Sequence, residues 1–146
     1  MPPMPPFPKT LLCASLAGLL LAGATLTVPA RAADGKSVFA SECAECHSAT
    51  QGKNKKGPSL FGIVNRPPGS VADFSGYSPD LKAYSAVLKS RSTDVMPNKG
   101  VWDANSLKAF LKQDSKKALP GTKMKYEGLE DEKELDALIA YLNTLH

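Results

Sequence analysis

The chain has 146 residues, with 18 basic and 14 acidic side chains and a formal net charge of +4. At this length we expect one domain with a modest hydrophobic core, in which a bound prosthetic group would fill part of the interior. The charge balance lies too close to neutrality to favour nucleic acid as a partner.

The first 32 residues are predicted to be a secretory signal peptide. Lys9 is the only charge before the apolar run Leu11–Val28, and Ala30-Arg31-Ala32 follows as a small-x-small cleavage site. An uncleaved membrane anchor is the alternative, because spanning a bilayer takes roughly 17–25 residues. Cleavage before Ala33 removes 32 of the 146 residues and leaves 114; without Lys9 and Arg31 the net charge falls to +2. Export predicts a periplasmic protein without a permanent membrane anchor.

A short helix is predicted directly after this leader. Asp34 can cap its first turn, and Val38 and Phe39 have the spacing of an apolar helix face. The helix is expected to run to Cys43, where the motif Cys43-Ala-Glu-Cys46-His47 begins.

Two thiols and an imidazole within five positions allow a zinc site, a thiol–disulfide switch or a covalently attached haem. Zinc usually takes four ligands, and the chain after the leader has no further Cys and only His146 as a further His. A redox Cys-x-x-Cys is expected in a βαβ context, which the helical pattern does not provide. Cys-x-x-Cys-His is the haem-attachment pattern. Thiols one helical turn apart can add to the two porphyrin vinyl groups, and His47 then ligates the iron. The motif favours haem over the two alternatives.

Residues 48–75 are rich in Gly, Pro, Lys and Ser and are predicted to be an irregular loop. Two similar Tyr-Ser units follow, beginning at Tyr77 and Tyr84. Two copies do not make a repeat architecture, so they predict a short helical insertion.

Two more helices are predicted in the C-terminal third. Trp102-Asp103 opens the first, and residues 115–129 are expected to be a loop. Acidic residues at 130–132 favour the start of the last helix, where negative charge suits the helix dipole. Its apolar stripe consists of Leu135, Leu138, Ile139, Leu142 and Leu145. No alternating pattern predicts a strand, so the chain is predicted to be all-α.

Residues 34–146 resemble the class I c-type cytochromes, the small group that includes mitochondrial cytochrome c and its bacterial relatives. The matching positions are Gly35, Phe39, Cys43, Cys46, His47, Gly57-Pro58-Ser59-Leu60, Arg66, Trp102, Leu107, Pro120-Gly121-Thr122-Lys123-Met124, Leu138 and Tyr141. The resemblance implies the cytochrome c fold, in which small helices and long loops surround one covalently bound haem. Residues 33–146 would form this single domain, with an insertion within about 67–100 that is atypical of the family.

The resemblance also implies a set of site residues. Haem c would be attached through Cys43 and Cys46, with His47 and Met124 as axial ligands and the Pro58 carbonyl accepting the His47 ring proton. Further cofactor contacts are implied for Arg66, Trp102, Thr122 and one tyrosine, for which we prefer Tyr84 to Tyr77. The competitors of Met124 for the distal position are Met96, His146 and Lys123.

The function that the resemblance implies is a monomeric, non-enzymatic carrier of single electrons in a respiratory or photosynthetic chain. Lysines at 53, 55, 56, 116, 117, 123 and 125 are expected to flank the haem edge. They would favour redox partners with acidic docking surfaces, such as a quinol-oxidising cytochrome complex, a terminal oxidase, a reaction centre or a periplasmic dehydrogenase. The alternatives are a haem enzyme or gas sensor with a labile sixth ligand, and a dedicated subunit that docks on a dehydrogenase or oxidase through residues 67–100.

Overall fold

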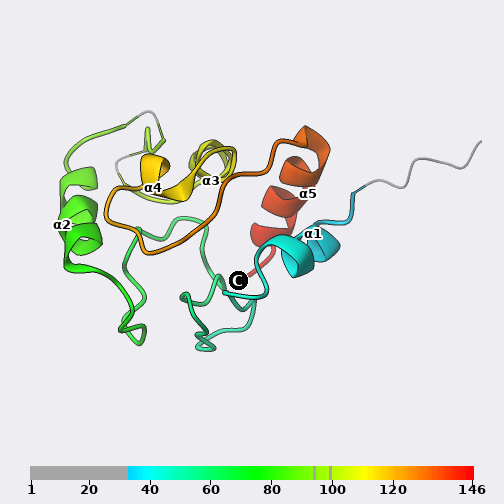
Figure 1. Cartoon of the computed structure of the whole chain (residues 1–146), viewed down its shortest axis with the longest axis horizontal. Helices are drawn as coiled ribbons and strands as arrows, with labels where there is room; N and C mark the ends of the chain where they lie inside the picture. The colour runs from blue at the N-terminus through cyan, green and yellow to red at the C-terminus, as the bar shows by residue number, and fades with distance from the viewer. Residues whose placement is uncertain (1–32, 94, 99) are drawn as a thin grey trace, which may run out of the picture. The chain divides into compact units, whose positions relative to one another are not determined.

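In the computed structural model, the described residues are 33–93, 95–98 and 100–146 (Figure 1). The predicted signal peptide, residues 1–32, lies outside them. They form five helices and no strand, which confirms the all-α prediction: α1 (Gly35–Glu42), α2 (Pro79–Leu88), α3 (Ala104–Leu111), α4 (Ser115–Ala118) and α5 (Glu132–Leu142). None of these helices is both long and apolar enough to cross a membrane.

Each of these helices follows an N-cap residue whose side chain accepts hydrogen bonds from backbone N–H groups of the first turn. These N-cap residues are Asp34, Ser78, Asp103, Asp114 and Asp131. The first-turn N–H groups have no partner inside the helix, and Ser and Asp are among the residues that satisfy them best. The starts predicted at Asp34 and near Asp103 are confirmed.

The segment 115–129 was predicted as a loop, and this is wrong for its first four residues, which form α4. Asp114 Oδ1 accepts from the backbone nitrogens of Lys116 and Lys117, at 2.9 and 3.0 Å. This cap stabilises a single helical turn. The turn ends at Leu119, whose backbone is no longer helical, as expected for a residue before a proline.

The helices α1 and α5 pack against each other, and α5 also packs on α3. A Cβ at Gly35 would overlap the Ala137 carbonyl, so only glycine permits this approach. The Phe39 and Tyr141 rings meet at 5.4 Å between centroids. Leu138 is completely buried. These helices therefore form the rigid part of the fold, beside which the long loops are arranged.

Candidate functional site

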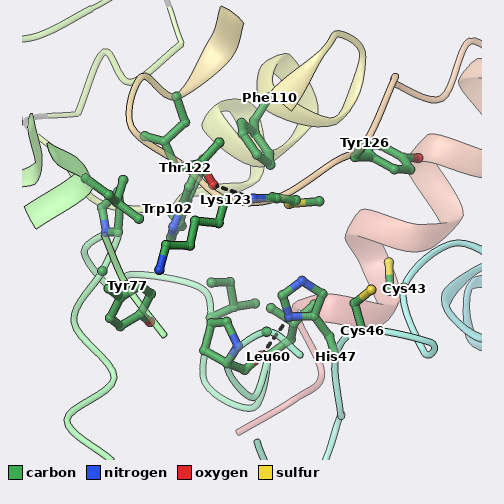
Figure 2. A pocket seen from close by; sticks show the side chains of 18 of the residues that line it. Cys43, Cys46, His47, Leu60, Tyr77, Trp102, Phe110, Thr122, Lys123 and Tyr126 are labelled. Carbon is green, nitrogen blue, oxygen red and sulfur yellow. Dashed lines mark hydrogen bonds between the residues drawn. The ribbon is translucent and has the colours of Figure 1, made fainter. Parts of the chain in front are cut away.

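A cavity of about 630 Å³ lies between the loops and is lined by Cys43, Cys46, His47 and Met124. Figure 2 shows the two cysteines beside His47 at one side of this cavity. Its volume falls within the roughly 300–1,000 Å³ of ligand pockets in proteins. Residues of one short motif and a methionine from near the other end of the chain thus face the same space.

The two cysteines differ in their surroundings. Cys43 ends α1 and is buried, whereas Cys46 is exposed, and no disulfide joins them. The turn between them is closed by His47 N–H donating to the Cys43 carbonyl at 2.8 Å. Burial, with a smaller contribution from the Glu42 charge, raises the pKa of the Cys43 thiol to about 12. Burial therefore disfavours the thiolate form of Cys43, which metal binding and disulfide exchange require.

The His47 ring is fixed from two directions. Its Nδ1 donates to the Pro58 carbonyl at 2.7 Å, which is the hydrogen bond that was expected. Because Nδ1 carries the proton, Nε2 keeps a lone pair that can ligate a metal. Gly57 lies against the ring so closely that a Cβ there would overlap it. Burial lowers the pKa of His47, and the Pro58 hydrogen bond opposes this only in part, so the ring is in its neutral, ligating form.

Arg66 also lines the cavity, but its guanidinium is engaged with the backbone. Nη1 donates to the Phe61 carbonyl and Nη2 to the Ser59 carbonyl, both at 2.8 Å. The Ser59 hydroxyl in turn donates to the Thr50 carbonyl at 2.7 Å. Burial lowers the pKa of Arg66, yet the group stays charged. The residues after the motif are thus tied to one another by short hydrogen bonds.

Met124 is held through its backbone by two hydroxyl groups. Its N–H donates to Thr122 Oγ1 at 3.2 Å, and its carbonyl accepts from Ser115 Oγ at 2.9 Å. Ser115 is completely buried, and its Oγ also accepts from Tyr126 N–H at 3.1 Å. Tyr126 Oη donates to the Glu42 carboxylate at 3.2 Å, which connects this loop to the end of α1. Neither Ser115 nor Tyr126 was among the site residues predicted from the sequence.

The three competitors of Met124 have different locations. Met96 is buried in the core with 1% exposure and does not line the cavity. His146 lines a separate and smaller cavity, of about 240 Å³. Lys123 does line the main cavity (Figure 2). Of these four candidates, Met124 and Lys123 line the main cavity, and Met124 carries the softer donor atom.

Trp102 and Phe110 form an aromatic wall of the cavity. Their ring centroids are 5.0 Å apart at an angle of 60°. The Trp102 backbone exchanges hydrogen bonds with Arg66 and Asn65, at 3.0 and 2.6 Å. Its indole N–H has no hydrogen-bond partner among the described residues. It is therefore a free donor on a side chain that lines the cavity.

The preference for Tyr84 over Tyr77 as a cavity residue is not supported by the structure. Tyr77 lines the cavity and Tyr84 does not (Figure 2). Ser78 caps α2 and Pro79 begins it, so Tyr77 precedes the helix and lies in the loop beside the cavity. Tyr84 is inside the helix and packs against the core. The pair Ser78-Pro79 is a recognisable helix start, and this signal distinguishes the two Tyr-Ser units.

The lysines are exposed, and three of them, Lys56, Lys123 and Lys125, line the cavity. Lys56 also pairs with Glu45 at 2.6 Å, and Lys55 donates to the Ala44 carbonyl. Positive charge is therefore present on both sides of the opening.

The donor set fits a covalently attached iron porphyrin. It comprises two thiols, a neutral imidazole and a thioether in one cavity with apolar walls, and His with Met is a ligand pair of haem iron. A zinc site fits poorly, because no group of three or more His, Cys, Asp and Glu side chains within the described residues is arranged to hold a metal.

Comparisons with known proteins agree with this chemistry. The family model for cytochrome c matches residues 32–146. Cytochrome c of Euglena viridis is 38% identical over 111 residues, which are 76% of this chain and 93% of that protein. Cytochrome c2 of Rhodopila globiformis is 35% identical over 80% of this chain and 95% of its own length. A cytochrome c homolog of Rickettsia felis is 37% identical over 77% of this chain and 55% of that protein.

Proposed function

Because this chain belongs to the cytochrome c family, we propose that it carries single electrons between redox proteins in the periplasm, through a haem ligated by His47 and Met124. Members of the family are electron carriers and not enzymes, and haem c is bound covalently through the Cys43 and Cys46 pair. The proposal adds the two axial ligands, the compartment and the partners.

The observation that carries the proposal is the meeting of Cys43, Cys46, His47 and Met124 in one cavity. The bound haem supplies the one-electron couple between ferrous and ferric iron. His47 contributes a neutral imidazole whose orientation is fixed by Pro58 and Gly57. Met124 contributes a soft thioether, which favours the reduced state relative to stronger donors. If His47 and Met124 both hold the iron, an external substrate would find no free position on it, which would suit a carrier better than a haem enzyme or gas sensor.

The surrounding residues adjust the electrostatics of the site. Arg66 and the free Trp102 indole N–H are donors suited to the anionic propionates of haem, and we assign them this role together with Tyr77. Thr122 acts through the backbone, because its hydroxyl holds the Met124 N–H. Apolar walls lower the local dielectric and disfavour the additional positive charge of ferric iron.

Spectroscopy of the purified protein tests the ligand assignment. The ferric protein is expected to show the thioether-to-iron charge-transfer band, and the ferrous protein to bind carbon monoxide poorly at neutral pH. Met124→Ala should abolish the band and open the site. Met96→Ala is the matched control, because Met96 is buried away from the cavity, and it should keep the band. A high-spin ferric spectrum of the unchanged protein would favour an enzyme or sensor instead.

Two further experiments test the partners and the compartment. The exposed lysines near the cavity should attract acidic docking surfaces, so electron transfer to an acidic acceptor should slow as ionic strength rises. A rate independent of salt would contradict this steering.

Cell fractionation should recover the protein, shortened at its N-terminus, from the periplasm. A full-length protein in the membrane fraction would indicate that the leader is retained as an anchor.

A further inference from the structure

The helix α2 has an unusual set of neighbours. No other helix of the described residues lies in contact with it. It buries Leu81, Ser85 and Leu88, which are spaced along one face, and it contacts loops. The Ser85 hydroxyl donates to the Pro68 carbonyl at 2.6 Å. Figure 1 shows the chain after α4 running out toward α2 and returning to α5. The loop that carries Met124 is thus a neighbour of α2.

Ser78 makes the direct connection between α2 and this loop. As the N-cap of α2, its Oγ accepts from Leu81 N–H at 3.0 Å. The same hydroxyl donates its proton to the Gly121 carbonyl. Ser78 is 9% exposed, so water competes little for either bond. One buried hydroxyl therefore both starts the helix and holds the loop.

Gly121 lies on the other side of this connection. Its φ is +82°, and a Cβ there would be 2.6 Å from Leu81 N and 2.7 Å from the Asp80 carbonyl carbon. These are backbone atoms, which cannot rotate away as a flexible side chain can. The loop and the first turn of α2 therefore approach as closely as two backbones allow, and only a glycine permits it.

The far end of α2 is anchored in a similar way. Gly100 has a φ of +76°, and a Cβ there would be 2.8–2.9 Å from backbone and side-chain atoms of Leu88. Since Leu81 and Leu88 are both buried, α2 is fixed along its length. It provides a firm support for the loop at Gly121.

Gly121 and Met124 are linked through a tight turn. Thr122 N–H donates to the Leu119 carbonyl at 3.1 Å, and Thr122 Oγ1 accepts from Met124 N–H at 3.2 Å. Releasing Gly121 from α2 would let this turn move as a unit. The thioether of Met124 would move with it.

We propose that Ser78 is a positioning residue for the Met124 ligand: by holding the Gly121 carbonyl against α2, it controls how easily an external ligand displaces the thioether. This inference rests on the proposed function, in which Met124 binds the haem iron. The inference gives the segment 67–100 a role inside the protein, whereas the alternative was that this segment docks on a partner.

The test uses the ferric holoprotein, titrated with imidazole, and follows the loss of the thioether-to-iron charge-transfer band. Ser78→Ala should lower the half-displacement concentration about fivefold, as expected for the loss of one buried hydrogen bond. Ser85→Ala is the matched control, since it removes another buried hydroxyl bond from the same helix but not from the loop. It should leave the half-displacement concentration unchanged.

Two more variants separate the two bonds of Ser78. Ser78→Asp keeps an N-cap acceptor but cannot donate to Gly121 when ionised, so it should weaken the ligand at least as much as Ser78→Ala. Ser78→Thr keeps both the acceptor and the donor and should match the unchanged protein. If Ser78→Ala fails to fold, Ser78→Asp still measures the loss of the donor on a capped helix.

Three results would overturn the inference. Equal half-displacement concentrations in Ser78→Asp and the unchanged protein would show that the bond to Gly121 does not position Met124. An equal fall in the Ser85→Ala control would show a general effect of weakening α2. Absence of the charge-transfer band in the unchanged protein would instead refute Met124 as the ligand, so failure of the proposed function is distinguishable from failure of this inference.

Discussion

The two sides of the cavity are built in different ways. The histidine side, residues 43–66, has many hydrogen bonds within one continuous segment, such as Gly57 N–H to the Cys46 carbonyl and Leu60 N–H to the Ser48 carbonyl, both at 2.8 Å, and its backbone also bonds to Trp102. The methionine side, residues 115–126, also has internal hydrogen bonds, among them those of Ser115 and Thr122, but two of the groups that tie it to the rest of the protein are side chains from distant segments. These are the Ser78 hydroxyl and the Glu42 carboxylate.

Because of this difference, we expect ligand exchange and global unfolding to respond to different substitutions. A segment tied to the rest of the protein through its backbone opens only when much of the fold opens, whereas a loop tied through a few side-chain bonds can move locally. We therefore expect substitutions on the methionine side to change ligand displacement, and those on the histidine side to change global stability. Imidazole displacement and denaturant unfolding are both measured for each variant.

The largest effect is expected from Gly121→Ala. The left-handed backbone costs a non-glycine residue about 1–2 kcal/mol, and the new Cβ would also clash with the backbone of α2, at 2.6 Å from Leu81 N. Overpacking of this kind adds about 1–3 kcal/mol. We expect the thioether band to be lost or displaced by much less imidazole than in the unchanged protein.

Gly52→Ala is the control for this prediction. Gly52 also has a left-handed backbone, with a φ of +66°, but a Cβ there would meet nothing within 4 Å. Only the backbone cost of about 1–2 kcal/mol should appear, and imidazole displacement should not change. If both alanines behaved alike, the close approach of α2 to the loop would have no energetic importance.

Arg66→Lys should have the next largest effect. This effect should appear in denaturant unfolding and not in imidazole displacement. Lysine keeps the charge but not the planar pair of donors that reaches the Ser59 and Phe61 carbonyls. Leaving part-buried carbonyls unpaired costs about 1–3 kcal/mol, which should appear as a lower midpoint of denaturant unfolding. If the midpoint of denaturant unfolding were unchanged and Met124 were displaced more easily, the histidine side would control ligand displacement and not global stability, the reverse of what we expect.

The same contrast explains what the sequence could predict. The histidine side is local, so a motif of five residues was enough to predict haem attachment at Cys43, Cys46 and His47, and the resemblance to the family implied the bond to Pro58. The helix starts at Asp34 and Asp103 were visible because each cap is adjacent in sequence to the helix that it begins. Local signals also contained the information that Tyr77 precedes α2, although the similarity of the two Tyr-Ser units concealed it.

The supports of the methionine side could not be predicted in this way. Ser78 and Gly121 are 43 positions apart, and neither residue type is distinctive in a loop. Their contact follows from how α2 packs on loops, which has no periodic pattern in the sequence. Ser115 was overlooked for a different reason, because its segment was assigned to a loop and its capped turn was missed.

Ser106→Ala should raise the global stability of the protein and leave the displacement of Met124 unchanged. Ser106 lies in α3 with no exposed surface, and its Oγ has no hydrogen-bond partner among the described residues. Removing an unpaired buried hydroxyl from a helix should raise the free energy of unfolding by about 1 kcal/mol. Imidazole displacement should stay constant, because the opening is local. If displacement became harder in proportion, the methionine side would open only through global unfolding.

Glu45→Gln should have the smallest effect, although Glu45 and Lys56 lie at the opening on the histidine side. The hydrogen bond from Lys56, and next its charge, lower the pKa of the Glu45 carboxyl. Any stabilisation is therefore present above the ordinary pKa of about 4.3 and is lost as the pH falls through the lowered value. Both side chains are exposed, so salt screens the pair. At physiological salt and neutral pH we expect denaturant unfolding to be indistinguishable from that of the unchanged protein. A clear loss there, absent once the pH lies well below the lowered pKa of Glu45, would mean that surface charge, and not the bonds within residues 43–66, holds this side together.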